Sequence, residues 1–264
     1  MDEEEVCRQD LAKLQFELST ARAGVQYESA EKLRYKERAL RAENRLMNVE
    51  LNAALARPSD HLDRFFAHPC KAKLAPFFPN AKEVTETFGA FHAVKQHLPH
   101  LRQGDPKVSV IVVGDGHSPR TGLLFALSSA WDVYSVDPAM RLKYRGLHDR
   151  LMLADMKIED VVGWSSLVDR RVLIVAVHSH AELKYAAAKV RACAGMDVVS
   201  IPCCVPQWVP YLDPSGAQTV VPVPPTVEYE DPAILSPERR VKVWRNVHEA
   251  MRDQHALARG LGVT

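Results

Sequence analysis

Two glycines and several polar side chains follow an apolar run near the middle of this chain. The run KVSVIVVG (107–114) ends at Gly114, and Asp115, Gly116 and Ser118 come soon after it. A glycine at such a point lets the backbone turn sharply and come close to a ligand. If a helix begins near Ser118, its free N–H groups point at the same space. The pattern predicts a ligand-binding loop, with a plain turn between strand and helix as the alternative.

Acidic and histidine side chains follow three later apolar runs. Asp137 comes about twenty residues after the loop, where a carboxylate accepts hydrogen bonds from both hydroxyls of a ribose. Asp155 ends the next run, from which a carboxylate can reach an adenine. His178 and His180 follow another run, and an imidazole titrates near neutral pH and can act as a general base. We expect the two aspartates to bind a nucleoside and the two histidines to be the candidate catalytic groups.

Apolar runs alternate with helical stretches from residue 107 onward, and these elements must position the polar residues. Strands are predicted at 107–114, 131–138, 151–156, 170–177, 196–205 and 240–247. Helices are predicted at 118–130, with Ser118 as the N-cap, and at 181–194. Apolar strands separated by helices predict an α/β fold with a doubly wound, mainly parallel sheet. Ligands of such sheets bind outside the carboxyl ends of the strands, where the strand order switches.

This set of motifs resembles the class I S-adenosylmethionine-dependent methyltransferases over roughly residues 107–250. VIVVGDGHS (110–118) is similar to the family's glycine-rich first motif, and VYSVDPAM (133–140) to the second, whose acidic residue holds the ribose. LADM (153–156) is similar to the third motif and VAVHSHAEL (175–183) to the fourth, where catalytic residues usually lie. The resemblance implies S-adenosylmethionine as the cofactor, bound by Gly114, Asp115, Gly116, Ser118, Asp137 and Asp155.

The chain also departs from the family's motifs. Val112 stands where the first motif usually has an acidic residue, and Ser118 replaces its third glycine. The fourth motif carries His178-Ser179-His180 in place of the proline-containing signature of amino-methylating enzymes. Two functions follow from this pattern. One is an enzyme that methylates an unknown acceptor, RNA or protein, and the other is an inactive methyltransferase-fold subunit that serves assembly or interaction.

Composition divides the chain near Pro58. We predict a helical arm at 1–57, a helical entry region at 58–106 and the methyltransferase-type domain at 107–264. Residues 5–56 contain no proline, and their apolar residues recur at spacings of three and four. This pattern predicts a long helix or coiled coil. The arm either pairs with another chain, as a homo-oligomer or with a protein partner, or folds back on its own domain.

Composition and charge bear on partners and compartment. A formal net charge of +1 gives no general argument for nucleic acid. A local basic cluster with an interleaved Trp244 still permits RNA contact, through Arg239, Arg240, Lys242 and Arg245. Five cysteines without a C-x-x-C pair and an acidic N-terminus predict an intracellular protein, cytoplasmic or nuclear.

Other segments carry weaker signals. No apolar stretch reaches the length of a membrane helix, so we predict no membrane association. The histidines of the entry region lack zinc-binding spacing, so we predict no metal site. The proline-rich segment 220–240 is predicted to be a loop that wraps the sheet edge or the mouth of the ligand site.

Overall fold

The computed structural model describes residues 59–162, 167–190, 194–203, 205, 207–212 and 218–247. The chain divides into two compact units, Met1–Ala53 and Ala54–Thr264, and all the described residues belong to the second. The predicted arm at 1–57 lies outside the described residues.

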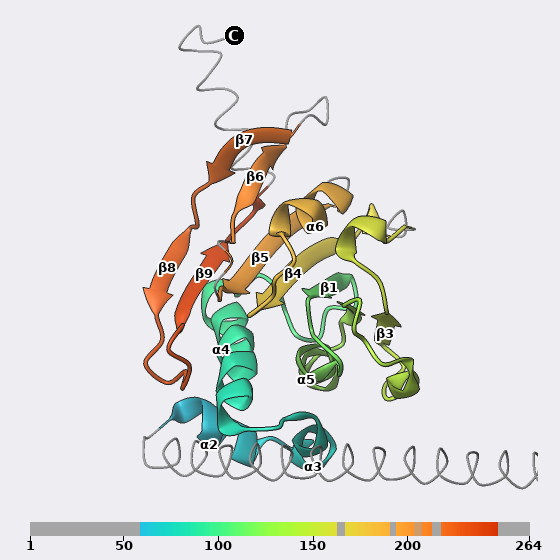
Figure 1. The fold of residues 1–264 in the computed structure, drawn as a ribbon, viewed down its shortest axis with the longest axis vertical. Helices are drawn as coiled ribbons and strands as arrows, with labels where there is room; N and C mark the ends of the chain where they lie inside the picture. The colour runs from blue at the N-terminus through green and yellow to red at the C-terminus, as the bar shows by residue number, and fades with distance from the viewer. Residues whose placement is uncertain are drawn as a thin grey trace, which may run out of the picture. The chain divides into compact units, whose positions relative to one another are not determined.

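A seven-stranded sheet runs through the second unit in the order β3-β2-β1-β4-β5-β9-β8 (Figure 1). Neighbouring strands from β3 to β5 are parallel, whereas β9 is antiparallel to both β5 and β8. The mostly parallel α/β sheet that the sequence predicts is present, with a strand at each of the six predicted positions. The strands are β1 (Val108–Val113), β2 (Asp132–Val136), β3 (Leu151–Ala154), β4 (Arg171–Val177), β5 (Gly195–Ile201), β8 (Val227–Glu230) and β9 (Arg240–Trp244).

Branched apolar residues hold β1 inside this sheet. All six residues of β1 are buried, and β2 and β4 flank it in parallel register. Val110, for example, lies opposite Val133 on one side and Leu173 on the other. Valine and isoleucine suit this position because their stiff, branched side chains pack well on a pleated surface. Full burial of one such side chain stabilises the folded state by about 1.5–3 kcal/mol. The buried strand β1 therefore fixes the position at which the following loop begins.

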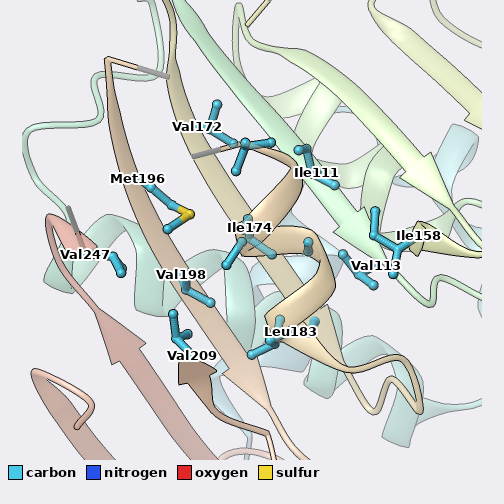
Figure 2. Packing of buried hydrophobic residues seen from close by; sticks show 14 of the residues in the cluster. Ile111, Val113, Ile158, Val172, Ile174, Leu183, Met196, Val198, Val209 and Val247 are labelled. Atoms are coloured by element: carbon cyan, nitrogen blue, oxygen red, sulfur yellow. The ribbon is translucent and has the colours of Figure 1, made fainter. Parts of the chain in front are cut away.

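Helices cover both faces of the sheet. Ile111 and Val113 belong to the same buried cluster as Leu183 of α6 (Leu183–Lys189) (Figure 2). Because side chains alternate along a strand, Val110 and Val112 point to the opposite face. There, α5 (Arg120–Ser128) contacts β1 and β2. The sheet is therefore wound on both sides, as apolar parallel strands require.

The longest described helix, α4 (Ala81–His97), lies beside α5 and also contacts β4, β5 and β9. The rings of Phe91 and Phe125 join the two helices edge to face, with centroids 5.0 Å apart. Asn80 begins α4, because its side-chain oxygen accepts a hydrogen bond from the Glu83 N–H at 2.9 Å. The shorter helices α2 (Asp60–Ala67) and α3 (Lys71–Leu74) precede α4, and α2 packs against it.

Three predicted elements differ from the structure. The segment 220–240 is not one long loop, because it contains the end of β7 (Gln218–Val223) and all of β8. β7 pairs with β6 (Val209–Leu212) in a separate hairpin. The helix predicted at 118–130 begins at Arg120, with Pro119 rather than Ser118 at the N-cap position. The strand predicted at 196–205 ends at Ile201, directly before a proline, which lacks the N–H that a ladder needs.

Candidate functional site

A cavity of about 520 Å³ lies at the carboxyl ends of the parallel strands. Its wall includes residues that follow β1, β2 and β4, together with the first turns of α4. The strand order switches here, since the chain runs from β1 outward to β3 and then returns to β4 on the other side. This is the place at which doubly wound sheets bind their ligands. Its main polar contributors are Lys82, Glu83, Glu86, Arg120, Asp137, Glu159, His178 and His180.

The two glycines of the loop after β1 have different roles. Both have left-handed backbone angles, with φ of +74° at Gly114 and +76° at Gly116. A Cβ at Gly114 would collide with the side chain of Ser179, because the loops after β1 and β4 pack closely there. A Cβ at Gly116 would have no neighbour closer than the Arg120 guanidinium at 3.8 Å. Gly114 therefore serves the packing of the loops, and Gly116 leaves backbone exposed at the cavity wall.

Asp115 supports the loop from within rather than offering a free carboxylate to the cavity. Its carboxylate accepts hydrogen bonds from the N–H groups of Thr121 and Gly122 at 3.0 and 2.9 Å, and from the Ser135 hydroxyl at 2.8 Å. It thereby satisfies the first N–H groups of α5, the task that the sequence analysis gave to Ser118. Burial raises the pKa of the Asp115 carboxyl, and these hydrogen bonds oppose that rise. Ser118 is not among the residues that line the cavity.

Asp137 lies where a ribose ligand would be expected. Its Oδ2 accepts a hydrogen bond from the Gly116 N–H at 2.9 Å, and its Oδ1 accepts one from the Ala139 N–H at 2.7 Å. A carboxylate has about four lone-pair sites, so Asp137, which lines the cavity, keeps acceptor capacity beyond these two hydrogen bonds. Asp155 is exposed and is not part of the cavity wall, where Lys157, Ile158 and Glu159 follow β3 instead.

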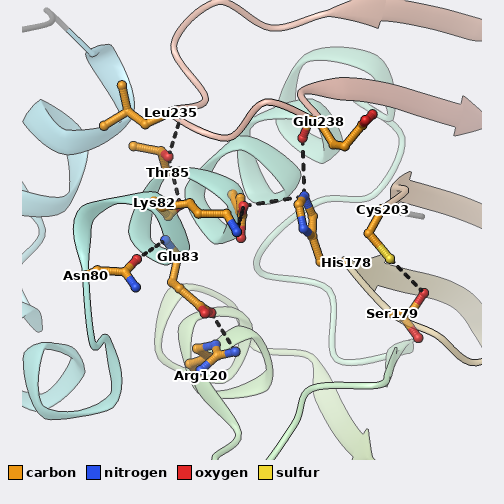
Figure 3. Close-up of polar contacts among 11 residues, drawn as sticks. Asn80, Lys82, Glu83, Thr85, Arg120, His178, Ser179, Cys203, Leu235 and Glu238 are labelled. Atoms are coloured by element: carbon orange, nitrogen blue, oxygen red, sulfur yellow. Dashed lines mark hydrogen bonds and ion pairs between the residues drawn. The ribbon is translucent and has the colours of Figure 1, made fainter. Parts of the chain in front are cut away.

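His178 and His180, the two candidate catalytic residues, both line the cavity. His178 has a φ of +48°, a left-handed conformation that is uncommon for a side chain of this size. Its Nε2 lies 3.2 Å from the Glu238 carbonyl oxygen (Figure 3). The same nitrogen lies 3.4 Å from Glu86 Oε1. Burial lowers the pKa of the His178 imidazole. His180 is exposed at the cavity rim.

The first turns of α4 bring charged groups that the sequence analysis missed. Glu83 pairs with Arg120 at 2.5 Å, so this ion pair joins the first turns of α4 and α5 (Figure 3). Glu86 has a side chain only 4% exposed, and burial raises the pKa of Glu86 to about 7. One signal was present in the sequence. Glu86 stands four residues before Ala90 and eight before Val94, which places a carboxyl in line with the apolar face of the helix.

Two glutamates of β8 pair with part of the basic cluster near the C-terminal end. Arg239 pairs with Glu230 at 3.4 Å, and Glu228 lies 3.6 Å from Arg240 and 3.7 Å from Lys242. These pairs offset two of the four positive charges, and RNA contact stays a prediction.

The part of the chain that the structure describes offers neither a metal site nor a membrane span. No group of three or more His, Cys, Asp or Glu side chains is placed to hold a metal ion there. No helix among the same residues combines the length and apolar character needed to cross a bilayer.

Comparisons with known proteins give partial likenesses. No protein-family model matches the chain, and a search of curated proteins finds no significant match. A protein from Methanococcus maripaludis assigned as an S-adenosyl-L-methionine-dependent methyltransferase is 17% identical, with a TM-score of 0.32, over 50% of this chain and 58% of its own. A protein from Galdieria sulphuraria assigned as a sarcosine dimethylglycine methyltransferase is 10% identical, with a TM-score of 0.31, over 41% and 45%. The plantazolicin methyltransferase BpumL, in complex with SAH, is 14% identical, with a TM-score of 0.30, over 60% and 62%.

The chain therefore spans between 45% and 62% of the length of these three structures. The order and direction of the strands indicate the fold class. Its five adjoining parallel strands are followed by an antiparallel β9 inserted before β8, and this mixed, mostly parallel sheet fits a class I methyltransferase fold.

Proposed function

We propose that this protein binds S-adenosylmethionine in the cavity at the strand ends and transfers its methyl group to an acceptor. The observation that carries the proposal is the contact between the two strand-end loops. The Gly116 N–H donates to Asp137 Oδ2 at 2.9 Å, and both residues face one cavity at the switch in strand order. A glycine backbone next to a carboxylate suits the sugar of a nucleoside, because the carboxylate accepts from hydroxyls and no side chain blocks the approach.

The residues present fit such a cofactor in size and in chemistry. A cavity of about 520 Å³ lies within the usual range of roughly 300–1,000 Å³ for small-molecule sites. Asp137 is the proposed ligand of the ribose hydroxyls, and Gly116 leaves room beside it. Asp115 takes a supporting role in this proposal, because its carboxylate is already bound by α5 and Ser135. Ile158, which is buried against the cavity, is proposed in place of Asp155 as the surface for the adenine.

S-adenosylmethionine would supply a methyl group on a positively charged sulfur, ready for in-line attack by a nucleophile. Much of the rate of such a reaction comes from positioning. Glu86, His178 and Gly116 all line the cavity in which the reaction is proposed to take place. His178 and His180 remain the candidate catalytic side chains.

Calorimetric titration with S-adenosylhomocysteine tests the proposal. Asp137→Ala removes a charge-assisted pair of hydrogen bonds worth roughly 1.5–3 kcal/mol each, so affinity should fall about tenfold or more. Asp137→Asn keeps the shape and should lose less. Asp169→Ala is the matched control, because this exposed aspartate precedes β4 at the opposite end of the strands. An equal loss of affinity in Asp169→Ala and Asp137→Ala would contradict the assignment.

A non-catalytic function is the second candidate, and the first motif supports it. Val112, at the position where the family usually has an acidic residue, is 1% exposed and packs inside the sheet. In this alternative the fold serves as an assembly subunit, and residues 5–56 associate with another chain. Wild-type protein that shows no affinity for S-adenosylmethionine or S-adenosylhomocysteine would favour it.

A further inference from the structure

Glu86 is the buried group that cofactor binding leaves unexplained. Among the described residues its Oε1 has no hydrogen-bond partner, although the side chain is only 4% exposed. The nearest charged atoms are His178 Nε2 at 3.4 Å and Lys82 Nζ at 3.8 Å, and the Lys82 side chain is 46% exposed. A buried polar atom without a partner is destabilising, because it has lost its hydrogen bonds to water. Its position in the cavity wall beside an imidazole calls for a functional reason.

The Glu238 carbonyl determines which nitrogen of His178 carries the proton. A carbonyl oxygen can only accept a hydrogen bond, so a contact of 3.2 Å to Nε2 requires a proton on Nε2 in the neutral ring. The lone pair of the neutral ring is then on Nδ1. Glu86 approaches the protonated nitrogen, which is the side from which a carboxylate stabilises an imidazolium.

The backbone of His178 helps to hold the imidazole in place beside Glu86. A non-glycine residue at φ +48° is strained, and such strain persists where the surrounding structure holds it. Here the His178 N–H donates to the Ile201 carbonyl at 2.8 Å, and the ring is held at Nε2. The strained backbone keeps the imidazole against α4 and at the cavity wall, where an asparagine or glycine would adopt this conformation more easily.

We propose that Glu86 and His178 form a proton-accepting pair in the cavity, and that the methyl acceptor of this site is a hydroxyl group. This inference rests on the proposed methyl transfer. The acceptor oxygen forms a bond to the methyl carbon while the bond from carbon to sulfur breaks, and its electron pair goes to sulfur. The hydroxyl proton goes to His178 Nδ1. A hydroxyl needs such a base because it keeps its proton at neutral pH, whereas a free amine or a thiolate attacks without one.

In this pair His178 is the proton acceptor and Glu86 is a positioning residue that acts through it. The other charged groups near the pair are Lys82 and Glu83 on α4, Arg120 on α5 and Glu238 before β9. Burial raises the pKa of Glu86 to about 7 and lowers that of His178. Above neutral pH, therefore, the pair holds an ionised carboxylate and a neutral imidazole. That is the state ready to receive a proton.

Nitrogen NMR of the full chain labelled with ¹⁵N-histidine tests the pair without a known acceptor. His178→Asn, which suits the positive φ, identifies the His178 signals by their loss. We expect the proton on Nε2 at high pH, and a wild-type titration midpoint of His178 below the ordinary histidine pKa because the ring is buried. In Glu86→Gln that midpoint should fall by about one pH unit or more, since the coupled carboxyl is gone. Glu159→Gln, on the part of the cavity wall that follows β3, is the control and should leave the midpoint unchanged.

Calorimetry with S-adenosylhomocysteine on the same proteins separates this inference from the proposed function. Glu86→Gln should bind it within about threefold of the wild type, because the residue acts on the proton and not on the cofactor. A proton on Nδ1, or an unchanged midpoint in Glu86→Gln, would overturn the pair. A tenfold loss of affinity in Glu86→Gln would make Glu86 a cofactor ligand instead. Failure of the wild type to bind at all would refute the methyl transfer, and with it the hydroxyl acceptor, whatever the NMR titration shows.

Discussion

Substitution of Glu86 by glutamine should change how the stability of the protein depends on pH. The pKa of Glu86 rises from 4.5 to about 7 on folding because the carboxyl is buried on α4. The folded state therefore holds this proton more tightly than the unfolded state. The resulting stabilisation is complete below pH 4.5 and is lost as the pH rises through 7. At 1.36 kcal/mol per pH unit the loss is about 3 kcal/mol.

Urea unfolding measured at several pH values between 4.5 and 8 tests this reasoning. The difference in unfolding free energy between Glu86→Gln and the wild type should shift in favour of the variant by about 3 kcal/mol across that window. Using the difference cancels the titration of the histidines and carboxylates that do not interact with Glu86. Glu83→Gln, on the same helix, should keep the wild-type decline because Glu86 is still present. A difference that stays constant from pH 4.5 to 8 would refute the burial of an ionisable carboxyl at this position.

Two further substitutions test the loop after β1. Gly114→Ala places a Cβ against Ser179 at a φ of +74°, so it should lower stability by about 2 kcal/mol or more in thermal unfolding. The control is Gly146→Ala, at φ +81° with nothing within 4 Å, which should lower stability less. Equal losses of stability in the two variants would contradict the packing argument. Asp115→Ala removes three hydrogen bonds to the start of α5 and to Ser135, so it should lower the free energy of unfolding by about 2–3 kcal/mol. The control is Asp105→Ala, which removes one exposed hydrogen bond from the Lys107 N–H and should lower it far less. Similar losses in the two variants would contradict the capping role of Asp115.

The strands that build the sheet could be predicted because their patterns depend on burial alone. β1 and β4 are runs of branched apolar residues buried on both faces, and such runs in alternation with helices have few other solutions. β8 could not be predicted in the same way. It is an edge strand of four residues whose side chains alternate between exposed and half-buried, and it lies among prolines that indicate a loop.

The candidate site was predictable where it depends on the strand ends and not where it depends on distant segments. Gly116 and Asp137 follow consecutive strands, so the parallel sheet brings them together. Asp115 looked like a ligand from its place between two glycines, yet the position of α5 and Ser135 turns its carboxylate inward. Glu86 comes from α4, 92 residues before His178. A contact over that separation depends on how the helix packs on the sheet, which no local pattern contains.

A crystal structure of the protein soaked with S-adenosylhomocysteine is the most direct test of the central claim. We predict density for an adenosyl group in the cavity at the strand ends, with its ribose hydroxyls within hydrogen-bond distance of the Asp137 carboxylate and its sugar over Gly116. Density at another place on the molecule, or a cavity that stays without the nucleoside at a saturating concentration, would contradict the account.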